Sequence, residues 1–374
     1  MNISQFVAVC RVLISMCILA CVTYAQSTGT VFEFPIMYPA HPPVMGCSMH
    51  HGSATGSTHE ITFNEKGGKD IWITGQNEDK VVRITLDGKM TFYDMPLGSG
   101  PHGIEFDADG RVWVTLEFAG KIVRLDQNGR IDKAYDVRLA CATCPAPLDS
   151  HPHGMGFAPD KRTIWYTGKA TGTVGRITPD GKIQTFQLPT VGSVPIYVKA
   201  GPDKNMWVTE LVGNVIARVT QMGKVDEFCI PTHNSRPIAI VPGPDGNMWF
   251  SEEAGNKVAR IDMQGNITEY PVPMKQPNMI LAGLSFDNQK NLWVQQYVDQ
   301  NNPVPAGTDY IIKIDKAILT TAPSNLPNSA FTFYPVPTKE TVFHRIIQGP
   351  DGNMWFTEMK ADKVGKLITG ANPF

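Results

Sequence analysis

A ten-residue phrase recurs along this chain and limits what the chain can fold into. It stands nearly unchanged at residues 243–252 and 349–358, as Gly-Pro-Asp-Gly-Asn-Met-Trp-Phe, then Ser or Thr, then Glu, with a close variant at 201–210. Looser copies surround the other four of the seven tryptophans, so each tryptophan marks one copy, in steps of 41 to 62 residues. A period near 42 residues, with a turn before alternating apolar strands, is typical of propellers of four-stranded blades. We therefore expect an all-β fold, a seven-bladed β-propeller.

The second repeat illustrates the expected blade. Its inner, second, third and outer strands are predicted at residues 101–107, 111–117, 121–126 and 130–137. The last repeat has only three such strands, and residues 31–36 near the N-terminus resemble the outer strands of other blades. We expect this segment to complete the last blade, which closes the ring and leaves no open edge.

The N-terminal segment differs in character from the repeats. Arg11 precedes an apolar run from Val12 to Val22, and small residues lead to Ala25. This pattern predicts a secretory signal peptide at residues 1–25, with an uncleaved anchor as the alternative. We expect residues 26–374 to form a single propeller domain that is secreted, monomeric and free of the membrane after cleavage. With a net charge of -2, nothing argues for a nucleic acid or an acidic membrane surface as partner. We expect a small-molecule substrate and no nucleic acid.

Four cysteines follow the predicted signal peptide: Cys47, Cys141, Cys144 and Cys229. An oxidising compartment makes disulfides possible. We expect a structural disulfide that lies within the 141–144 loop or joins this loop to Cys47. We expect Cys229, inside an outer strand, to be a buried free thiol.

The longest connections fall mainly at one end of the expected ring. Residues 38–58, 138–151 and 298–307 connect strands at the end where the inner strands begin, which we call the upper end. The insertion at 316–330 belongs to the opposite, lower end. Because loops placed on a rigid scaffold commonly carry function, we expect the site at the upper end.

Two sets of side chains are expected around the upper mouth of the channel. The first set opens the inner strands, and in blade order it is His59, His102, His153, Ile196, Ile238, Asn278 and His344. The four histidines fall in adjacent blades once the ring is closed. Neutral imidazoles that converge on a channel are ready ligands for a divalent transition metal. The alternative is a repeated Pro-His-Gly element whose imidazoles bond only to neighbouring backbone.

The second set closes the second strands, and in blade order it is Gln76, Glu117, Lys169, Glu210, Glu252, Gln296 and Glu358. Carboxylates at these places are candidates for binding a cation or for acid–base chemistry. We favour Glu117 and Glu358, which lie in histidine-bearing blades. For Glu210 and Glu252 we expect simple pairing with Arg218 and Arg260.

The repeated phrase, followed by Lys-Val-Ala-Arg-Ile or Lys-Val-Gly-Lys-Leu, resembles the streptogramin B lyase (virginiamycin B lyase) family over about residues 59–369. The resemblance implies a seven-bladed propeller and a magnesium-aided elimination that opens a cyclic depsipeptide at its ester. It also implies that His344 is the catalytic base and that Glu358 approximately matches a metal ligand.

The chain departs from the pattern of that family at two site positions. Val342 stands where the family has a metal-binding glutamate, although Glu340 is close by. Asn278 stands where the family has a histidine that contacts substrate. The fold therefore follows from the resemblance, whereas the antibiotic-opening activity does not.

We predict a secreted, metal-assisted, lyase-like enzyme, a carbon-oxygen lyase of the streptogramin lyase type, acting on a small cyclic or lactone-containing metabolite. His344 is the expected catalytic base, and the expected metal ligands are Glu358, His59, His102, His153 and Glu117. The resemblance implies magnesium, whereas the histidines alone suit zinc, manganese or iron. Two alternatives remain open: a non-catalytic propeller that binds a glycan, peptide or protein, and a metal-dependent hydrolase or oxygenase using the channel histidines.

Overall fold

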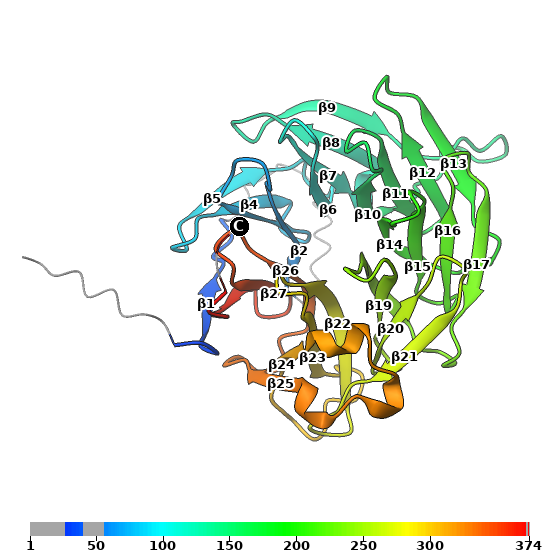
Figure 1. The fold of residues 1–374 in the computed structure, drawn as a ribbon. Coiled ribbons are helices and arrows are strands. Elements are labelled where there is room, and N and C mark those ends of the chain that lie inside the picture. The colour runs from blue at the N-terminus through cyan, green and yellow to red at the C-terminus, as the bar shows by residue number, and fades with distance from the viewer. Residues whose placement is uncertain (1–26, 40–55, 372, 374) are drawn as a thin grey trace, which may run out of the picture.

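The computed structural model describes residues 27–39, 56–371 and 373, and it shows a closed ring of seven blades (Figure 1). The predicted signal peptide and Cys47 lie outside the described residues. Among the described residues, no helix is both long and apolar enough to span a membrane.

Each blade is a sheet of four antiparallel strands, ordered from the channel outward. The inner strands are β2 (Thr58–Phe63), β6 (Pro101–Phe106), β10 (Pro152–Phe157), β14 (Pro195–Ala200), β18 (Pro237–Pro242), β22 (Met279–Phe286) and β26 (Phe343–Gln348). The second strands are β3 (Ile71–Gly75), β7 (Val112–Leu116), β11 (Ile164–Gly168), β15 (Met206–Glu210), β19 (Met248–Glu252), β23 (Leu292–Val298) and β27 (Met354–Glu358). The prediction of a seven-bladed propeller is confirmed.

The outer half of each blade is equally regular. The third strands are β4 (Lys80–Ile84), β8 (Lys121–Leu125), β12 (Thr173–Ile177), β16 (Val215–Val219), β20 (Lys257–Ile261), β24 (Tyr310–Ile314) and β28 (Lys363–Leu367). The outer strands are β5 (Met90–Asp94), β9 (Ile131–Asp136), β13 (Ile183–Gln187), β17 (Val225–Cys229), β21 (Ile267–Pro271), β25 (Phe331–Pro335) and β1 (Val31–Pro35). Short 3-10 helices are η1 (Glu117–Ala119), η2 (Lys316–Leu319), η3 (Pro323–Asn325) and η4 (Asn328–Ala330).

The repeated phrase builds the turn and the second strand of a blade. In the last blade, Asp351 accepts hydrogen bonds from the backbone N–H of Asn353 at 3.2 Å and from Nε1 of Trp355 at 3.0 Å. Asp203 and Asp245 make the same pair of bonds in their own blades. The tryptophans are buried between blades, so the aspartate satisfies an indole N–H that would otherwise have no partner.

Every tryptophan stacks on an aromatic ring from the outer strand of its own blade. The ring centroids lie 5.4 to 5.9 Å apart in the pairs Trp72–Tyr93, Trp113–Tyr135, Trp165–Phe186, Trp207–Phe228, Trp249–Tyr270, Trp293–Tyr334 and Trp355–Phe34. In six blades, an arginine or lysine of the third strand lies over the tryptophan ring at 5.0 to 5.9 Å. These contacts tie three strands of each blade together.

The ring is closed by β1, which pairs antiparallel with β28 from Val31–Leu367 to Pro35–Lys363. Phe34 of β1 stacks on Trp355 as the outer-strand aromatics do in other blades. The same ring fills the space beside Gly88 of the first blade, where a Cβ atom would lie 2.5 Å from Phe34 Cδ1. Gly88 also has a φ of 91°, so a larger residue there would be strained in two ways. Closure by the N-terminal segment agrees with the prediction.

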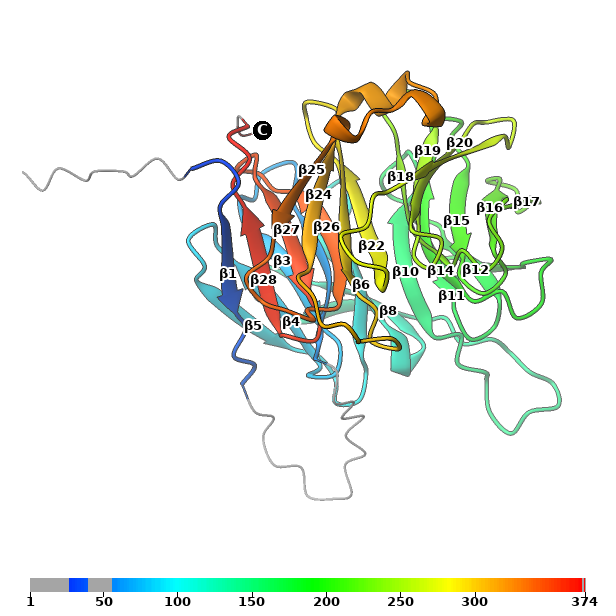
Figure 2. The ribbon, with the colours of Figure 1, turned by 90° about the horizontal axis from the view of Figure 1, so that it is seen from below.

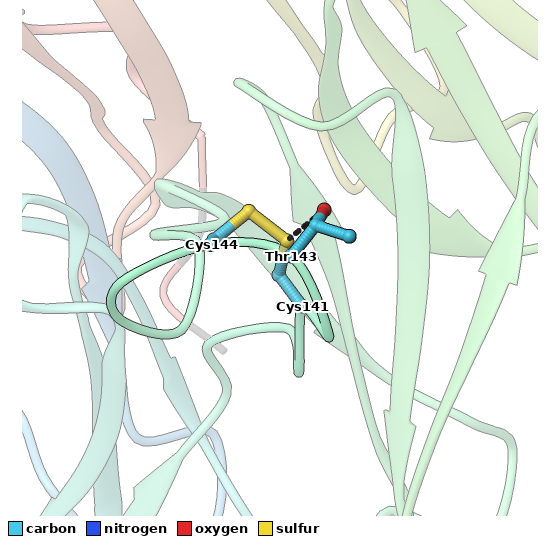
Figure 3. Close-up of a disulfide and its surroundings, with 3 residues drawn as sticks. All are labelled: Cys141, Thr143 and Cys144. Carbon is cyan, nitrogen blue, oxygen red and sulfur yellow. Dashed lines mark hydrogen bonds between the residues drawn. A yellow bond between two sulfur atoms is a disulfide. The ribbon is translucent and has the colours of Figure 1, made fainter.

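The two ends of the ring carry different connections. Figure 2 shows η2–η4 at one end and the 138–151 loop at the other, in agreement with the assignment of these insertions. Cys141 and Cys144 form a disulfide within the upper loop (Figure 3), one of the two predicted arrangements. The prediction for Cys229 is half wrong: its thiol is free but exposed, because the residue ends an outer strand that no further strand covers.

Removal of residues 26–37 should open the ring, because β28 would lose its partner and Trp355 its stacking ring. We expect the truncated chain to melt at lower temperature and to aggregate through the exposed edge of β28. A milder change, Phe34→Ala, should cost about 2–4 kcal/mol in urea unfolding. Met37→Ala is the matched control, since Met37 is 80% exposed. An unchanged melting temperature in the truncated chain would contradict closure by β1.

Candidate active site

Each inner strand has a β-bulge near its start, and the bulge sets the orientation of the residues at the channel. In the second blade, Pro101 pairs with Leu116 and Ile104 with Val114, so His102 and Gly103 together oppose Thr115. The Thr115 hydroxyl accepts from the N–H of Gly103 at 2.7 Å and donates to the carbonyl of His153 at 3.0 Å. In four blades the polar residue two positions after the tryptophan thus satisfies the bulge and links it to the next blade, as Thr74, Thr115, Gln295 and Thr357 do.

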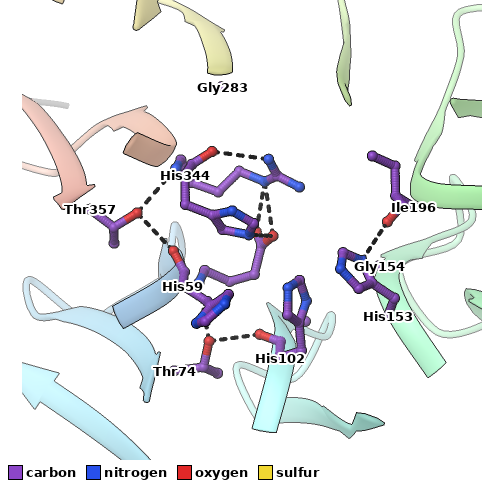
Figure 4. Close-up of polar contacts among 12 residues, drawn as sticks. His59, Thr74, His102, His153, Gly154, Ile196, Gly283, His344 and Thr357 are labelled. Carbon is purple, nitrogen blue, oxygen red and sulfur yellow. Dashed lines mark hydrogen bonds and ion pairs between the residues drawn. The ribbon is translucent and has the colours of Figure 1, made fainter. Parts of the chain in front are cut away.

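The bulges bring four histidines together at the upper channel, one from each of four adjacent blades (Figure 4). The ring centroid of His102 lies 3.6 Å from that of His153, 5.1 Å from that of His59 and 5.2 Å from that of His344. The rings of His59 and His344 are 5.0 Å apart. The four histidines therefore lie together at one mouth of the channel, as their equivalent positions in the repeat predicted.

Burial favours the neutral form of all four imidazoles, and backbone carbonyls fix the tautomer of two of them. Burial lowers the pKa of all four, that of His59 to about 3, and neighbouring histidines, Lys169 or Arg345 lower it further. Nδ1 of His59 faces the carbonyl of Ser57 at 2.6 Å, and Nδ1 of His153 faces the carbonyl of Ile196 at 3.0 Å. In a neutral ring these Nδ1 atoms must donate, which leaves each Nε2 with a lone pair.

Glu60 and Arg345 complete the cluster, and sequence reasoning missed both. His344 Nε2 lies 3.1 Å from Glu60 Oε1, and Arg345 Nε lies 2.9 Å from the same oxygen. Burial opposes ionisation of Glu60, but Arg345 and His344 outweigh it and lower its pKa to about 2. A signal was present, because charged residues follow the histidine where the next two blades have Gly103 and Gly154.

Glu117 lies on the other side of the cluster and belongs to η1, just after the strand end. Its carboxylate accepts from Gln76 Nε2 at 2.5 Å and from Lys169 Nζ at 3.1 Å. Burial raises its pKa despite Lys169. Among the described residues, two groups have ligand atoms within 4.8 Å of one another: Glu60–His102–His344 and His102–Glu117–His153. His59 and Glu358 belong to neither group.

Comparison with known proteins agrees with this architecture. The family model described as "Virginiamycin B lyase family" matches residues 140–304, and an "SMP-30/Gluconolactonase/LRE-like region" matches residues 79–147. A virginiamycin B lyase of Nocardia farcinica is 30% identical over 136 residues, which cover 36% of this chain and 43% of that protein. This match therefore spans less than half of the curated relative.

Solved structures match over nearly the whole chain. One is a catalytically inactive histidine-to-alanine variant of virginiamycin B lyase from Staphylococcus aureus with quinupristin. It is 31% identical, has a TM-score of 0.70, and is aligned over 91% of this chain and 99% of its own. The chain belongs to the virginiamycin B lyase family. A streptogramin B lyase structure, 26% identical with a TM-score of 0.70, covers 90% of this chain and 97% of its own.

The virginiamycin B lyase family's position for the substrate histidine was assigned to the wrong residue. The hydrogen bond from the N–H of Gly283 to Gln295 matches the one from Arg345 to Thr357, so Ala282, not Asn278, corresponds to His344. Asn278 instead precedes a longer β22 and donates to the carbonyl of Asn302 at 2.7 Å. Ala282 and His344 lie at the same distance in sequence before Trp293 and Trp355, whereas the prediction of Asn278 relied on the preceding Pro277.

The predicted set of residues that close the second strands combines two different positions of the repeat. Glu210, Glu252 and Glu358 are the last residues of their strands, whereas Glu117 lies one residue beyond the end of β7. The three strand-end carboxyls are buried, and burial raises the pKa of each to about 8. The pKa of Glu358 responds to Glu33, Lys363 and Asp309, and to none of the histidines. The structure does not bring Glu358 together with the other predicted ligands.

The expected pairing of Glu210 and Glu252 with arginines is also wrong. Arg218 instead donates to Asp226 at 2.8 Å, and Arg260 donates to the carbonyl of Leu319 at 2.8 Å. Both arginines lie over tryptophan rings, three residues along the paired strands from the carboxylates. The strand-end carboxylates are thus an ordinary feature of this repeat.

These carboxyls should make folding stability depend on pH. Each folded pKa of about 8 exceeds the ordinary value of 4.5, so the stabilisation is complete below pH 4.5 and is lost as pH rises through 8. The expected slope is about 1.4 kcal/mol per pH unit for each carboxyl. Glu252→Gln should reduce the slope of the unfolding free energy against pH, measured by urea unfolding between pH 4.5 and 8, by the contribution of one carboxyl. Glu340→Gln, which changes a pair with Lys360 at the surface, should leave the slope unchanged. Identical slopes in all three chains would refute this account.

Proposed function

We propose that the upper channel carries out a lyase reaction on a small cyclic or lactone-containing metabolite, with His344 as the general base. The observation that carries this proposal is the contact between His344 Nε2 and the buried Glu60 carboxylate at 3.1 Å. Because Glu60 can only accept, it fixes the proton on Nε2 and leaves the lone pair on Nδ1. A neutral histidine oriented by a carboxylate is suited to accept a proton.

The reaction class follows from the relatives, which are named lyases. In the proposed carbon-oxygen cleavage, His344 takes a proton from the carbon next to a carbonyl. The electron pair left on that carbon forms a double bond with its neighbour, and the ester C–O bond there breaks to release a carboxylate. The catalytically inactive Staphylococcus aureus lyase carries a histidine-to-alanine change, which supports a histidine in this role.

Arg345 supports the base without facing the reaction. Its Nε binds Glu60 at 2.9 Å and its Nη1 donates to the carbonyl of His344 at 3.0 Å. The guanidinium keeps Glu60 ionised, so the carboxylate can orient the imidazole at any pH where the protein is folded and His344 is neutral. Arg345 is therefore a positioning residue.

The magnesium site implied by the family does not fit this chain. Magnesium favours oxygen ligands, commonly carboxylates. Val342 offers no oxygen from its side chain, Glu340 is paired with Lys360 at 3.3 Å, and Glu358 belongs to neither group of converging ligand atoms.

A different donor set suits a borderline transition metal such as zinc, manganese or iron. We propose His102, Glu117 and His153 as its ligands. Nδ1 of His102 is buried without a hydrogen-bond partner, and His153 presents Nε2 because Nδ1 is bonded to Ile196. A cation there would polarise the carbonyl of a bound substrate. Without it, the Lys169 ammonium bonded to Glu117 supplies positive charge beside these histidines and lowers their pKa.

We further propose that the protein is secreted, monomeric and specific for a small molecule. The Cys141–Cys144 disulfide supports an oxidising compartment. The narrow histidine-lined mouth favours a small ligand over a macromolecule.

His344→Ala should abolish turnover of a cyclic depsipeptide or lactone while the melting temperature changes little. The expected loss of kcat/KM is about 10²–10⁴-fold, as for removal of a general base. Glu252→Gln and Glu358→Gln are matched controls that should retain activity, because both carboxylates lie away from the histidines. If wild type shows no turnover and binds a ligand as tightly as His344→Ala does, the protein is a binding propeller instead.

The metal proposal is tested by elemental analysis and zinc titration of the purified protein. We expect about one equivalent of transition metal, lost in Glu117→Gln. Lys169→Met should tighten zinc binding, because the metal would no longer compete with an ammonium for Glu117. Glu210→Gln is the control. Zinc affinity unaffected by both Glu117→Gln and Lys169→Met would overturn this assignment.

A further inference from the structure

A second site lies in the lower channel and shares Arg345 with the histidine cluster. A cavity of about 210 Å³ is lined by inner-strand residues of six blades and by a turn of the remaining one. Its lower mouth is formed by turns that include Lys66 and Lys161. Because every blade contributes, the cavity must lie on the propeller axis.

The walls of this cavity combine apolar surface with a polar side that carries both charges, the cations being Lys66, Lys161, Lys199 and Arg345 and the carboxylates Glu65, Glu105 and Asp107. Phe106, Val241 and Leu284 are among the apolar lining residues. Lys199 and Arg345 lie on the polar side, where the Arg345 guanidinium is 4.2 Å from the Tyr197 ring centroid. Such a lining is typical of small-ligand pockets, in which a few polar groups orient an apolar molecule.

Arg345 has one hydrogen-bond donor group, Nη2, that is not used within the described part of the protein. Its Nε is taken by Glu60 and its Nη1 by the carbonyl of His344, whereas Nη2 has no hydrogen-bond partner among the described residues. The side chain is 5% exposed, so this donor is buried at the wall of the cavity. A buried guanidinium N–H without an acceptor is costly, and a carboxylate is its best complement.

Lys199 supplies a second positive charge beside Arg345. Its Nζ pairs with Glu105, and both side chains are about one quarter exposed. Burial lowers the pKa of Lys199 to about 8, against the attraction of Glu60, so the ammonium form persists at neutral pH. An incoming carboxylate would bind Arg345 Nη2 and share Lys199 with Glu105.

We propose that the lower channel binds a small monocarboxylate with an apolar body, held by Arg345 and Lys199. The apolar walls exclude water from the body of the ligand, and Lys66 and Lys161 at the mouth favour entry of an anion. This site shares Arg345 with the pair that orients His344, but its ligand enters from the opposite end of the channel and its binding does not require turnover in the upper channel.

The test is calorimetric titration with benzoate at a pH of about 6.5, below the pKa of Lys199. Benzamide, which has the same shape without the charge, is the matched ligand control, and acetate tests the need for an apolar body. We expect benzoate to bind about tenfold more tightly than either. Equal binding of benzoate and benzamide, or no binding of benzoate, would overturn the proposal and leave a water-filled channel.

Two variants should move benzoate affinity in opposite directions. Lys199→Met should weaken it about tenfold, and Glu105→Gln should strengthen it by freeing Lys199 from its partner. His344→Ala should bind benzoate as wild type does, so failure of the lyase proposal would leave this result intact. Unchanged affinity in both Lys199→Met and Glu105→Gln would refute the site, whatever the activity of the upper channel.

Discussion

The stack of each second-strand tryptophan on an outer-strand aromatic ring is the contact on which the rest of the structure depends. It joins the second strand to the outer strand, in six blades with a cation of the third strand lying over the tryptophan, and so ties the sheet into one unit. The outer ring also reaches the next blade: Tyr93 fills the space beside Gly129, as Phe34 does beside Gly88. One aromatic position therefore fixes both the inside of a blade and its neighbour, and β1 must supply it for the last blade.

A rigid closed ring gives the channel its chemistry, because it joins residues that are remote in the chain. Glu60 and His344 are 284 residues apart, yet they share a hydrogen bond. Glu60 and Arg345 stand at positions where neighbouring blades have glycine, and each would be a buried unpaired charge if the ring were open. Paired, they satisfy each other and hold His344 in one orientation. The closure that stabilises the fold thus also assembles the base.

Periodicity explains which features were predictable from the sequence. The blade count, the closing strand and the four channel histidines all follow from positions that repeat relative to tryptophan. The predictions that were wrong fall where the repeat is locally irregular. Because β22 is longer than the other inner strands, Asn278 was taken as the equivalent of His344 in place of Ala282. Because η1 follows β7 directly, Glu117 was taken as equivalent to Glu210 and Glu358, which are the last residues of their strands. The Glu60–Arg345 contact has no signal in spacing, since it depends on which blades meet at closure. It could be found only by asking why two charges replace glycine beside a histidine.

Glu60 and Glu117 are each paired with a cation, but the two cations differ in how far they are buried. This difference gives the two carboxylates different roles. Arg345 is 5% exposed and uses two nitrogens on Glu60 and the His344 carbonyl, so the Glu60 pair can hardly open. Lys169 is 37% exposed and holds Glu117 through one contact at 3.1 Å, so its ammonium can move into water at small cost. A metal could therefore displace Lys169 from Glu117 but not Arg345 from Glu60. The Glu60 side is built to orient a base, and the Glu117 side is the one able to exchange a fixed cation for a bound one.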